Sequence, residues 1–343
     1  MSMNKLRVLA LVHRHLIPPD TVEEGIDITA APWRTEYDVI TTLRAMGHEV
    51  QPLGVHDDLG ELRRASTEWK PHIAFNLLEA FDYITIFDQN VVSHLELLKL
   101  SYTGCNPRGL LLARDKSLSK KLLAYHRIEV PAFVEFRIGR PIRRPKRLAF
   151  PLIVKSLTQE ASIGISQASV VDADDKLKER VTFIHESIGT AAIVEQYIEG
   201  RELYVGILGN QTLQALPVWE LFFTNMPSEA KRIATGRVKW SVKYQKKYGI
   251  ESGLARDLPE DVPELVQHIC KRAYRALELS GFARIDLRLD VAGKVWVLEA
   301  NPNPQIAKGE DFAASADKIG ISYESLLQRI VNLGLRWQPE SFA

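Results

Sequence analysis

The sequence predicts an α/β protein in which a parallel sheet with crossover helices is followed by two smaller α+β units. Apolar, strand-like runs alternate with helical segments through the first 114 residues, which is typical of a parallel sheet. A strand, a loop, a helix and a strand follow up to residue 202, and the last part contains a long helix and a regular hairpin. A chain of 343 residues is too long for one compact core, so we expect two or three packed domains.

The bulk composition is that of an ordinary soluble protein. Hydrophobic residues make up 45% and charged residues 25%, and the net charge of +1 predicts no attraction to nucleic acid or membrane. Only Cys105 and Cys270 are present, which fits a reducing compartment. No signal peptide is recognisable, and no run approaches the roughly 20 apolar residues of a membrane span. We therefore expect a cytoplasmic protein with neither a nucleic-acid nor a membrane partner.

The periodicity of the sequence predicts individual elements. In the first block, strands are expected at 6–12, 49–53, 72–77 and 102–103, and helices at 35–46, 58–69 and 90–100. Asp115 is expected to cap a helix that runs to about residue 126. Strands at 152–155 and 191–197 then enclose a helix at 177–187. The last block contains strands at 204–208, 213–221, 282–290 and 294–300, and helices at 262–279 and 323–333.

Residues 139–150 are rich in proline and basic side chains. The basic residues are Arg140, Arg143, Arg144, Lys146 and Arg147. They form either an anion-binding patch or a solvated loop between strands, and we favour the loop.

The hairpin at 284–301 is the most informative pattern. With Ala292–Gly293 as a two-residue loop, Val291 pairs with Lys294, Asp286 lies opposite Glu299, and Arg284 lies opposite Asn301. The other face then carries Ile285, Leu287, Leu289, Trp296, Leu298 and Ala300, which predicts packing on a core.

Two facing carboxylates are destabilising unless a cation lies between them. Asp286 and Glu299 supply the carboxylates, and Asn301 adds a neutral oxygen on the same face. Oxygen ligands few in number suit magnesium, which keeps waters and binds phosphates. The alternative is a solvated hairpin with incidental charges.

The phosphate-binding elements are less specific. The sequence has neither a Walker A motif nor a Gly-x-Gly-x-x-Gly motif. A strand ending at Lys155 instead leads into a loop of small residues that ends at Gly164, whose N–H groups and the lysine can bind an anion. A plain hairpin loop explains this segment equally well. The strand Glu195–Gln196–Tyr197–Ile198 and the nearby Glu202 are unremarkable in isolation.

The order of these elements resembles the ATP-grasp superfamily and, within it, the D-alanine–D-alanine ligase-like branch. The similarity runs from about Lys116 to about Pro304. It implies an ATP-grasp fold, two α+β subdomains that clamp ATP, preceded by a Rossmann-like N-terminal domain. The implied domains are residues 1–114, 115–202 and 203–343, the last with the metal and catalytic residues.

The resemblance also implies a role for each residue. ATP is expected to contact Lys116, Lys155, Ser162, the adenine clamp Glu195, Gln196, Tyr197 and Ile198, and the ribose ligand Glu202. Lys239 would reach the γ-phosphate and Arg284 would steady an acyl phosphate. Asp286, Glu299 and Asn301 would hold Mg²⁺, with Mn²⁺ as the alternative metal.

The implied reaction joins a small-molecule carboxylate to an amine. The γ-phosphoryl group passes to the carboxylate, and the amine attacks the acyl phosphate, so catalysis is mostly positioning and charge stabilisation. The loops 159–164 and 237–248 would close over ATP as lids. Members of this family are commonly dimers, so a homodimer is possible.

The substrate side departs from the D-alanine–D-alanine ligase pattern. The segment His13–Asp20 lacks the glycine- and serine-rich turn with a glutamate for the first alanine, and surface positions are expected for Glu23, Glu24 and Glu36. The phosphate loop keeps one serine, Ser162, after Glu160 and Ala161. The run Asn301–Phe312 lacks the serine that would bind the second carboxylate, and it contains Lys308, Glu310 and Asp311.

Three functions follow from this comparison. We favour a carboxylate–amine ligase with a different substrate pair over a true D-alanine–D-alanine ligase. A nucleotide-binding regulator without catalysis comes third, because the lysines, Arg284 and the metal set are all present.

His13 and His15 lack a third ligand nearby, so no zinc site is expected. Glu79 follows a predicted parallel strand, at the edge where ligands bind in such sheets, but a substrate role for it is the less favoured interpretation.

Overall fold

The computed structural model describes residues 5–159 and 162–339, so Glu160 and Ala161 of the expected phosphate loop lie outside the described residues. The helices are α1 (Arg34–Ala45), α2 (Gly60–Glu68), α3 (Asp88–Leu97), α4 (Pro107–Arg114), α5 (Lys116–Tyr125), α6 (Asp174–Phe183), α7 (Gly236–Trp240), α8 (Val242–Tyr248), α9 (Val262–Ala276), α10 (Asp311–Asp317) and α11 (Tyr323–Arg336). The strands are β1 (Arg7–His13), β2 (Glu49–Val55), β3 (Ile73–Asn76), β4 (Phe133–Phe136), β5 (Leu152–Ser156), β6 (Val170–Val171), β7 (Ala192–Gln196), β8 (Gly200–Leu208), β9 (Gln214–Ala215), β10 (Trp219–Phe223), β11 (Ile250–Leu254), β12 (Phe282–Asp290) and β13 (Val295–Asn301).

The N-terminal part forms a parallel sheet in the order β2-β1-β3. The predicted strands and helices of this block are confirmed, except that the strand at 102–103 is a single bridge from Tyr102 to Ala74. Gly47, with φ of +92°, ends α1 as expected. The helices α1 and α2 connect the strands as crossovers, which explains why the sheet is parallel.

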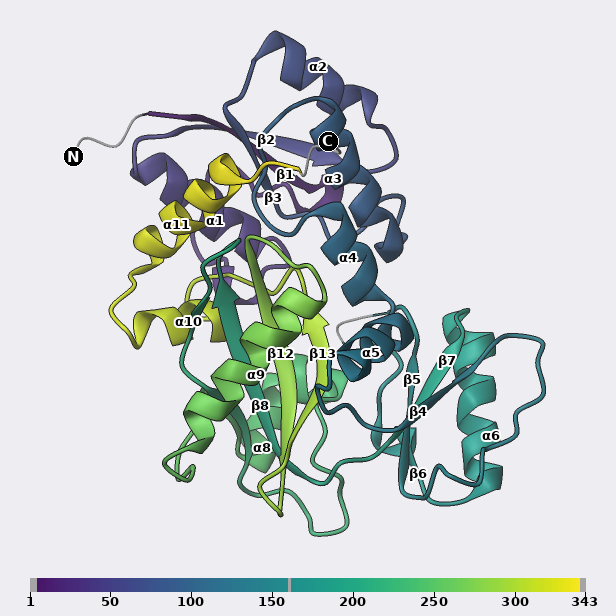
Figure 1. Cartoon of the computed structure of the whole chain (residues 1–343). Coiled ribbons are helices and arrows are strands. Elements are labelled where there is room, and N and C mark those ends of the chain that lie inside the picture. Colours follow the sequence, from purple (N-terminus) through teal and green to yellow (C-terminus); the bar gives the residue numbers. More distant parts are fainter. Residues whose placement is uncertain (1–4, 160–161, 340–343) are drawn as a thin grey trace.

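Two further sheets make up the rest of the chain, and they face each other across α5 (Figure 1). The smaller one has the order β4-β7-β5-β6 and is covered by α6, which continues into a π-helical turn at Ile184–Ile188. The larger one has the order β11-β10-β8-β12-β13, with β9 paired to β8, and α9 packs against it. The sequence analysis missed α4, β4, β11 and α10, and the single strand expected at 213–221 is divided into β9 and β10.

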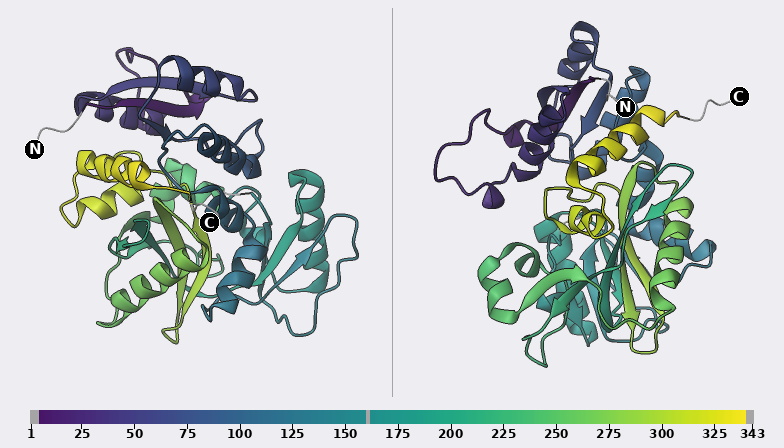
Figure 2. Two further views of the ribbon diagram at one scale, coloured as in Figure 1. Left: turned by 45° about the horizontal axis from the view of Figure 1, so that its top comes forward. Right: turned by 90° about the vertical axis from the view of Figure 1, so that its left-hand side faces the viewer.

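The last helix, α11, packs against the N-terminal sheet as well as against α10, which precedes it in the sequence. Figures 1 and 2 show it beside α1 and the N-terminal strands. Its apolar side chains Leu327, Ile330 and Val331 share one core with Val8 and Phe75. The contact is close because Gly334 has no side chain: a Cβ there would lie 2.3 Å from the carbonyl oxygen of Tyr102.

Both cysteines are free and buried, and no helix within the described residues is long and apolar enough to cross a bilayer.

We expect Gly334→Ala to destabilise the protein by about 1–3 kcal/mol, although alanine favours a helix over glycine by about 1 kcal/mol. The added methyl group would overlap the backbone at Tyr102 and force α11 away from the sheet. Urea unfolding measures the effect. Gly236→Ala is the matched control, because no atom lies within 4 Å of a Cβ at that helical position. Equal stability of both variants and the wild type would contradict this account of the contact.

Candidate active site

The β12–β13 hairpin brings the predicted metal residues together. Asp286 lies opposite Glu299 and Arg284 lies opposite Asn301, as predicted. The path to that register is different, because Asp290 rather than Val291 pairs with Lys294, and the turn is one residue longer. A bulge beyond Leu287 then shifts the register back.

The longer turn puts the opposite set of β13 side chains on the core face as far as the bulge, which restores the predicted face. Val295, Val297 and Ala300 are buried against the core, so placing Trp296 and Leu298 there was wrong. Trp296 instead donates its indole N–H to Asp290, and Leu298 lines the cleft between the two sheets.

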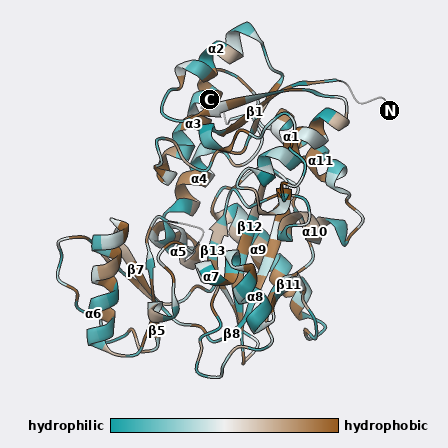
Figure 3. Cartoon of the chain, turned by 180° about the vertical axis from the view of Figure 1, so that it is seen from behind, coloured by the Kyte–Doolittle hydropathy of each residue, from teal (hydrophilic) through white to brown (hydrophobic). Residues whose placement is uncertain are grey.

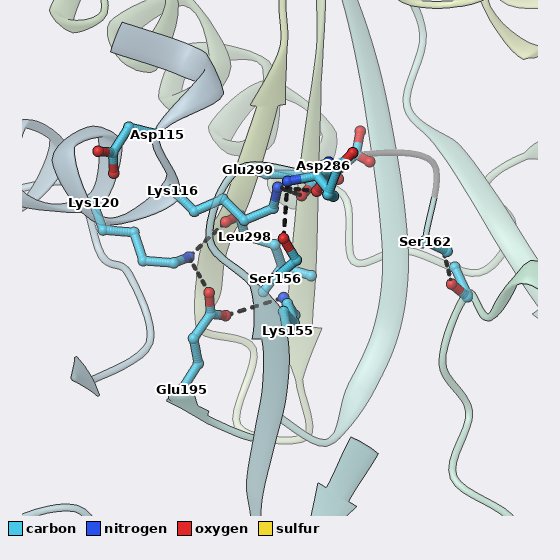
Figure 4. A network of polar contacts seen from close by, with 12 residues as sticks. Asp115, Lys116, Lys120, Lys155, Ser156, Ser162, Glu195, Asp286, Leu298 and Glu299 are labelled. Atoms are coloured by element: carbon cyan, nitrogen blue, oxygen red, sulfur yellow. Dashed lines mark hydrogen bonds and ion pairs between the residues drawn. The ribbon is translucent and has the colours of Figure 1, made fainter. Parts of the chain in front are cut away.

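A buried charge network connects the two halves of this cleft (Figure 4). The carboxylate of Glu195, on β7, lies 3.4 Å from the Lys120 ammonium and 3.1 Å from that of Lys155. Lys120 also donates to the carbonyl oxygen of Leu298 at 2.5 Å. Burial raises the pKa of Glu195, but the two ammonium groups outweigh burial, and its pKa is lowered overall. The residue is therefore ionised, with one ammonium group beside each carboxylate oxygen.

The carboxylates of the hairpin are also surrounded by cations. Arg284 donates two hydrogen bonds to Asp286, at 2.7 and 2.8 Å. Burial raises the pKa of Glu299, yet Lys116, Lys155, Lys239 and Arg284 together lower it to about 2. Burial also raises the pKa of Asp286, and Arg284 only partly opposes this. The facing carboxylates do not by themselves demand a metal, since Arg284 already neutralises one of them.

The expected adenine and ribose residues lie along the same cleft. Glu195, Gln196, Tyr197 and Ile198 all line it, as does Glu202. The Glu202 carboxylate is not free, because Arg288 forms an ion pair with it at 2.6 Å and Tyr204 donates to it at 2.9 Å. Arg288 also donates to the carbonyl oxygen of Ile198 and so holds the segment after β7 in place.

Two segments close the cleft from opposite sides. The Ser162 hydroxyl donates to the carbonyl oxygen of Ala234, and Gln167 exchanges two hydrogen bonds with the backbone of Lys231. The second lid was expected as a loop, but it forms α7 and α8, with Lys239 on α7 facing the cleft. The enclosed space is about 70 Å³, whereas small-molecule sites measure roughly 300–1,000 Å³. The two segments must therefore separate for a nucleotide to enter.

The charge balance of the cleft favours a polyanion. Its lining carries three cations, Lys155, Lys239 and Arg288, and four carboxylates, Glu195, Glu202, Asp286 and Glu299. Lys116, Lys120 and Arg284 lie next to this lining and pair with Glu299, Glu195 and Asp286, so six cations surround the four carboxylates. An excess of positive charge in a partly buried cleft attracts phosphates.

The donor set at the hairpin fits magnesium. Asp286 and Glu299 offer carboxylate oxygens side by side, and Asn301 offers an amide oxygen on the same face. Among residues 5–159 and 162–339, no three His, Cys, Asp or Glu side chains come together as a metal site.

Three predicted residues lie around the cleft but do not line it: Lys116, Arg284 and Asn301. Lys116 donates to the carbonyl oxygen of Gln159 at 2.7 Å and lies 4.0 Å from Glu299. Arg284 lies over the Tyr204 ring as well as against Asp286. The oxygen of Asn301 accepts from the N–H of Asn303.

The acidic pair after the hairpin has a structural role. Arg34 forms an ion pair with Glu310 at 2.6 Å and donates to the carbonyl oxygen of Lys308. Asp311 accepts hydrogen bonds from Trp219 and Ser252. Only the Lys308 side chain projects into solvent.

Glu36 corrects one sequence-based expectation. Glu23 and Glu24 are exposed as predicted, but Glu36 is 5% exposed and its Oε2 atom is buried without a hydrogen-bond partner among the described residues. Burial, with a contribution from the charge of Glu79, raises its pKa from the usual 4.5 to about 7.

Histidines gather at the carboxyl end of the N-terminal sheet. His13, His15 and His56 lie with Tyr83 so that ring centroids are 4.7–6.4 Å apart. His15 shares a hydrogen bond with the Tyr83 hydroxyl at 3.0 Å. The sequence analysis noted only His13 and His15, because His56 and Tyr83 join them through the fold.

The functional residues that the sequence analysis missed are Lys120 and Arg288. Arg288 continues the alternation of Arg284 and Asp286 along β12, so its place on the cleft face was predictable. No sequence pattern connects Lys120 with Glu195 and Leu298.

Comparisons with known proteins agree with this geometry. The family model described as D-ala D-ala ligase C-terminus matches residues 123–332. The chain is 31% identical to a D-alanine–D-alanine ligase from Desulforudis audaxviator, over 86% of this chain and 90% of the relative. It is 30% identical to the uncharacterized protein y4sG of Sinorhizobium fredii, over 89% of each. The solved structure of D-alanine–D-alanine ligase from Bacillus anthracis with ATP matches with a TM-score of 0.74 at 22% identity, over 96% of this chain and 98% of that one, and shows the same fold.

We expect Lys120→Met to lower the free energy of unfolding by about 3 kcal/mol, because removing one member of a buried charge pair costs roughly 3–5 kcal/mol and Lys155 still neutralises Glu195. Lys121→Met is the matched control. That neighbouring lysine is exposed and pairs with Glu135 at the surface, so a loss below about 1 kcal/mol is expected. Urea unfolding that gives equal losses would show that the network does not hold the fold.

Glu36→Gln is expected to stabilise the protein increasingly as pH rises. The raised pKa means that the folded chain binds the proton more tightly than the unfolded chain, so stability present below about pH 4.5 is lost as pH rises through 7. The uncharged variant avoids this loss of up to about 3 kcal/mol. Unfolding of both proteins at pH 5 and pH 8 measures it. Glu24→Gln, at an exposed position, should show no such trend, and a flat difference for Glu36→Gln would refute the argument.

Proposed function

Because the chain belongs to the D-alanine–D-alanine ligase family of ATP-dependent carbon–nitrogen ligases, we propose that it joins a carboxylate and an amine other than two D-alanines. The observation that carries this proposal is the contrast within one cleft. The lysines and carboxylates expected on the nucleotide side are all present. On the substrate side, Glu310 and Asp311 are instead bound by Arg34, Trp219 and Ser252. No serine is present between Asn301 and Phe312 to receive a second carboxylate.

We assign the nucleotide residues as follows. Lys116, Lys155 and Lys239 would neutralise the triphosphate with the Ser162 loop, Glu195 to Ile198 would hold adenine, and Glu202 would hold ribose. Asp286, Glu299 and Asn301 would hold magnesium. When bound, the metal supplies positive charge next to the phosphates.

Arg284 has two alternative partners in this scheme. It now holds Asp286 with two hydrogen bonds. Once Asp286 has a metal as its partner, the guanidinium is free to hold the anionic acyl phosphate and the developing oxyanion. Closure of α7 and of the segment around Ser162 excludes water from that intermediate.

The substrate amine has a candidate partner in Glu36. Its unpartnered, buried Oε2 atom and the nearby charge of Glu79 favour a cation. Their neighbours in the sequence contact the segment after the hairpin: Arg34 donates to the carbonyl oxygen of Lys308, and Leu78 accepts a hydrogen bond from Asn303. An ammonium group bound there would restore the ionised form of Glu36.

A true D-alanine–D-alanine ligase is the second candidate, supported by the 31% identical relative of that name. The domain bounds, the Rossmann-like N-terminal domain, a cytoplasmic location and a homodimer stay predictions.

ADP release in the presence of paired amino acids and small acids distinguishes the two candidates. We expect release with a mixed carboxylate–amine pair and little with D-alanine alone, because the second carboxylate site is absent. Strong release with D-alanine alone would favour the second candidate and reject the first.

Asp286→Asn or Glu299→Gln should lower magnesium-dependent turnover by about 100-fold or more, since each removes charge from the proposed metal site. Asp290→Asn is the control on the same strand, because its carboxylate only bonds the turn and Trp296. Turnover is followed as ADP release at saturating ATP and several magnesium concentrations. Near-normal rates in either hairpin variant would remove the metal assignment.

A further inference from the structure

The basic segment Arg137–Arg147 is not used by the cleft. It contains six basic residues, and the sequence has no acidic residue between Glu135 and Glu160. Arg137, Arg140, Arg143, Lys146 and Arg147 are exposed. Among the ion pairs of the described residues, one involves these five side chains. In it, Arg137 lies 3.8 Å from the Glu135 carboxylate. The whole protein carries a net charge of only +1, so this is a local concentration of positive charge.

The sixth residue, Arg144, fixes the shape of the segment. Its guanidinium donates to both oxygens of Asp174 and to the carbonyl oxygen of Leu148, and it lies 4.4 Å from the ring centre of Phe150. Pro141 and Pro145 restrict the backbone on either side. The exposed cations are therefore held in place by structure on both sides, which lowers the entropy that a partner must overcome.

A groove of about 510 Å³ lies next to this segment. It is lined by Lys121 and Ala124 of α5, by the six consecutive residues Val130 to Glu135, and by Arg147. Consecutive residues of a strand point to opposite faces, so a groove that touches all of them runs along the edge of the strand. The groove shares no residue with the lining of the nucleotide cleft.

The edge of β4 offers main-chain groups to this groove. In the described chain, β4 ends its sheet and pairs only with β7. Gln196 donates its N–H to the carbonyl oxygen of Ala132, which puts Ala132, Val134 and Phe136 in hydrogen-bonded positions. Because the pattern alternates in antiparallel pairs, the N–H and C=O groups of Phe133 and Glu135 point away from β7 and into the groove.

We propose that this groove binds an acidic peptide segment of a partner protein, which adds to β4 as an extended strand. Its main chain pairs with the outward groups of Phe133 and Glu135, its apolar side chains contact Val130, Pro131 and Phe133, and its carboxylates meet Arg147 and the other exposed arginines. Single-stranded nucleic acid fits less well, because it needs successive aromatic faces for its bases and Phe133 is the only aromatic residue of the lining.

The test measures binding of a fluorescein-labelled peptide of alternating glutamate and valine to the full chain by fluorescence anisotropy. We expect saturable binding that weakens with salt, because the cations are exposed. The triple variant R140E/R143E/R147E should bind at least tenfold more weakly, while ADP release stays unchanged, since none of these residues lines the cleft. Arg144 is left intact because it supports the loop.

A second pair of variants tests strand addition itself. Phe133→Pro removes one outward N–H without removing a bond to β7, and Phe133→Ala is its control with the N–H retained. We expect the proline variant to bind at least fivefold more weakly than the alanine variant.

Three results would overturn the proposal. They are absence of saturable binding to the wild type, unchanged affinity in the triple variant, and tighter binding of a single-stranded DNA octamer or of phosphatidylserine vesicles than of the peptide.

Discussion

The ion pair of Lys120 and Lys155 with Glu195 is the interaction on which the cleft depends. Glu195 belongs to β7 of the smaller sheet, Lys155 to the neighbouring strand β5, and Lys120 to α5 between the two sheets. Lys120 also donates to the carbonyl oxygen of Leu298, at the bulge of the β12–β13 hairpin. Buried pairs of this kind add little net stability compared with apolar packing, but breaking one is costly. The network therefore fixes where β7 lies relative to the β12–β13 hairpin.

Local periodicity predicted most of the elements and the faces of β12, and the family resemblance is confirmed. The hairpin shows how such a prediction succeeds for an incomplete reason. The turn was placed one residue too short, and the bulge at Leu298 was unforeseen; the two errors cancel at Asp286 and Glu299. Trp296 lies between the turn and the bulge, and Leu298 lies at the bulge. Both were therefore assigned to the wrong face. Figure 3, a ribbon coloured by hydropathy, shows hydrophilic and hydrophobic residues mixed along the helices and strands.

Long-range partners could not be predicted, because periodicity says which face a residue occupies but not what covers it. Arg34 meets Glu310 across 276 positions, and Lys120 meets Leu298 across 178. Glu36 is an instructive exception. It lies four and seven positions before Ile40 and Leu43 on the buried face of α1, so its burial was encoded in the helix phase. The assumption that a glutamate stays in water overrode that signal.

The position of α11 affects how the chain is made. The apolar face of β1 and β3 is covered by α1 and by α11, and α11 begins 247 positions after β3 ends, at 323 against 76. During synthesis, the strands and α1 have been made after roughly 80 residues, but α11 follows only after the two sheets of the cleft. The core of the first sheet is therefore completed later than that of an N-terminal domain closed by its own helices alone.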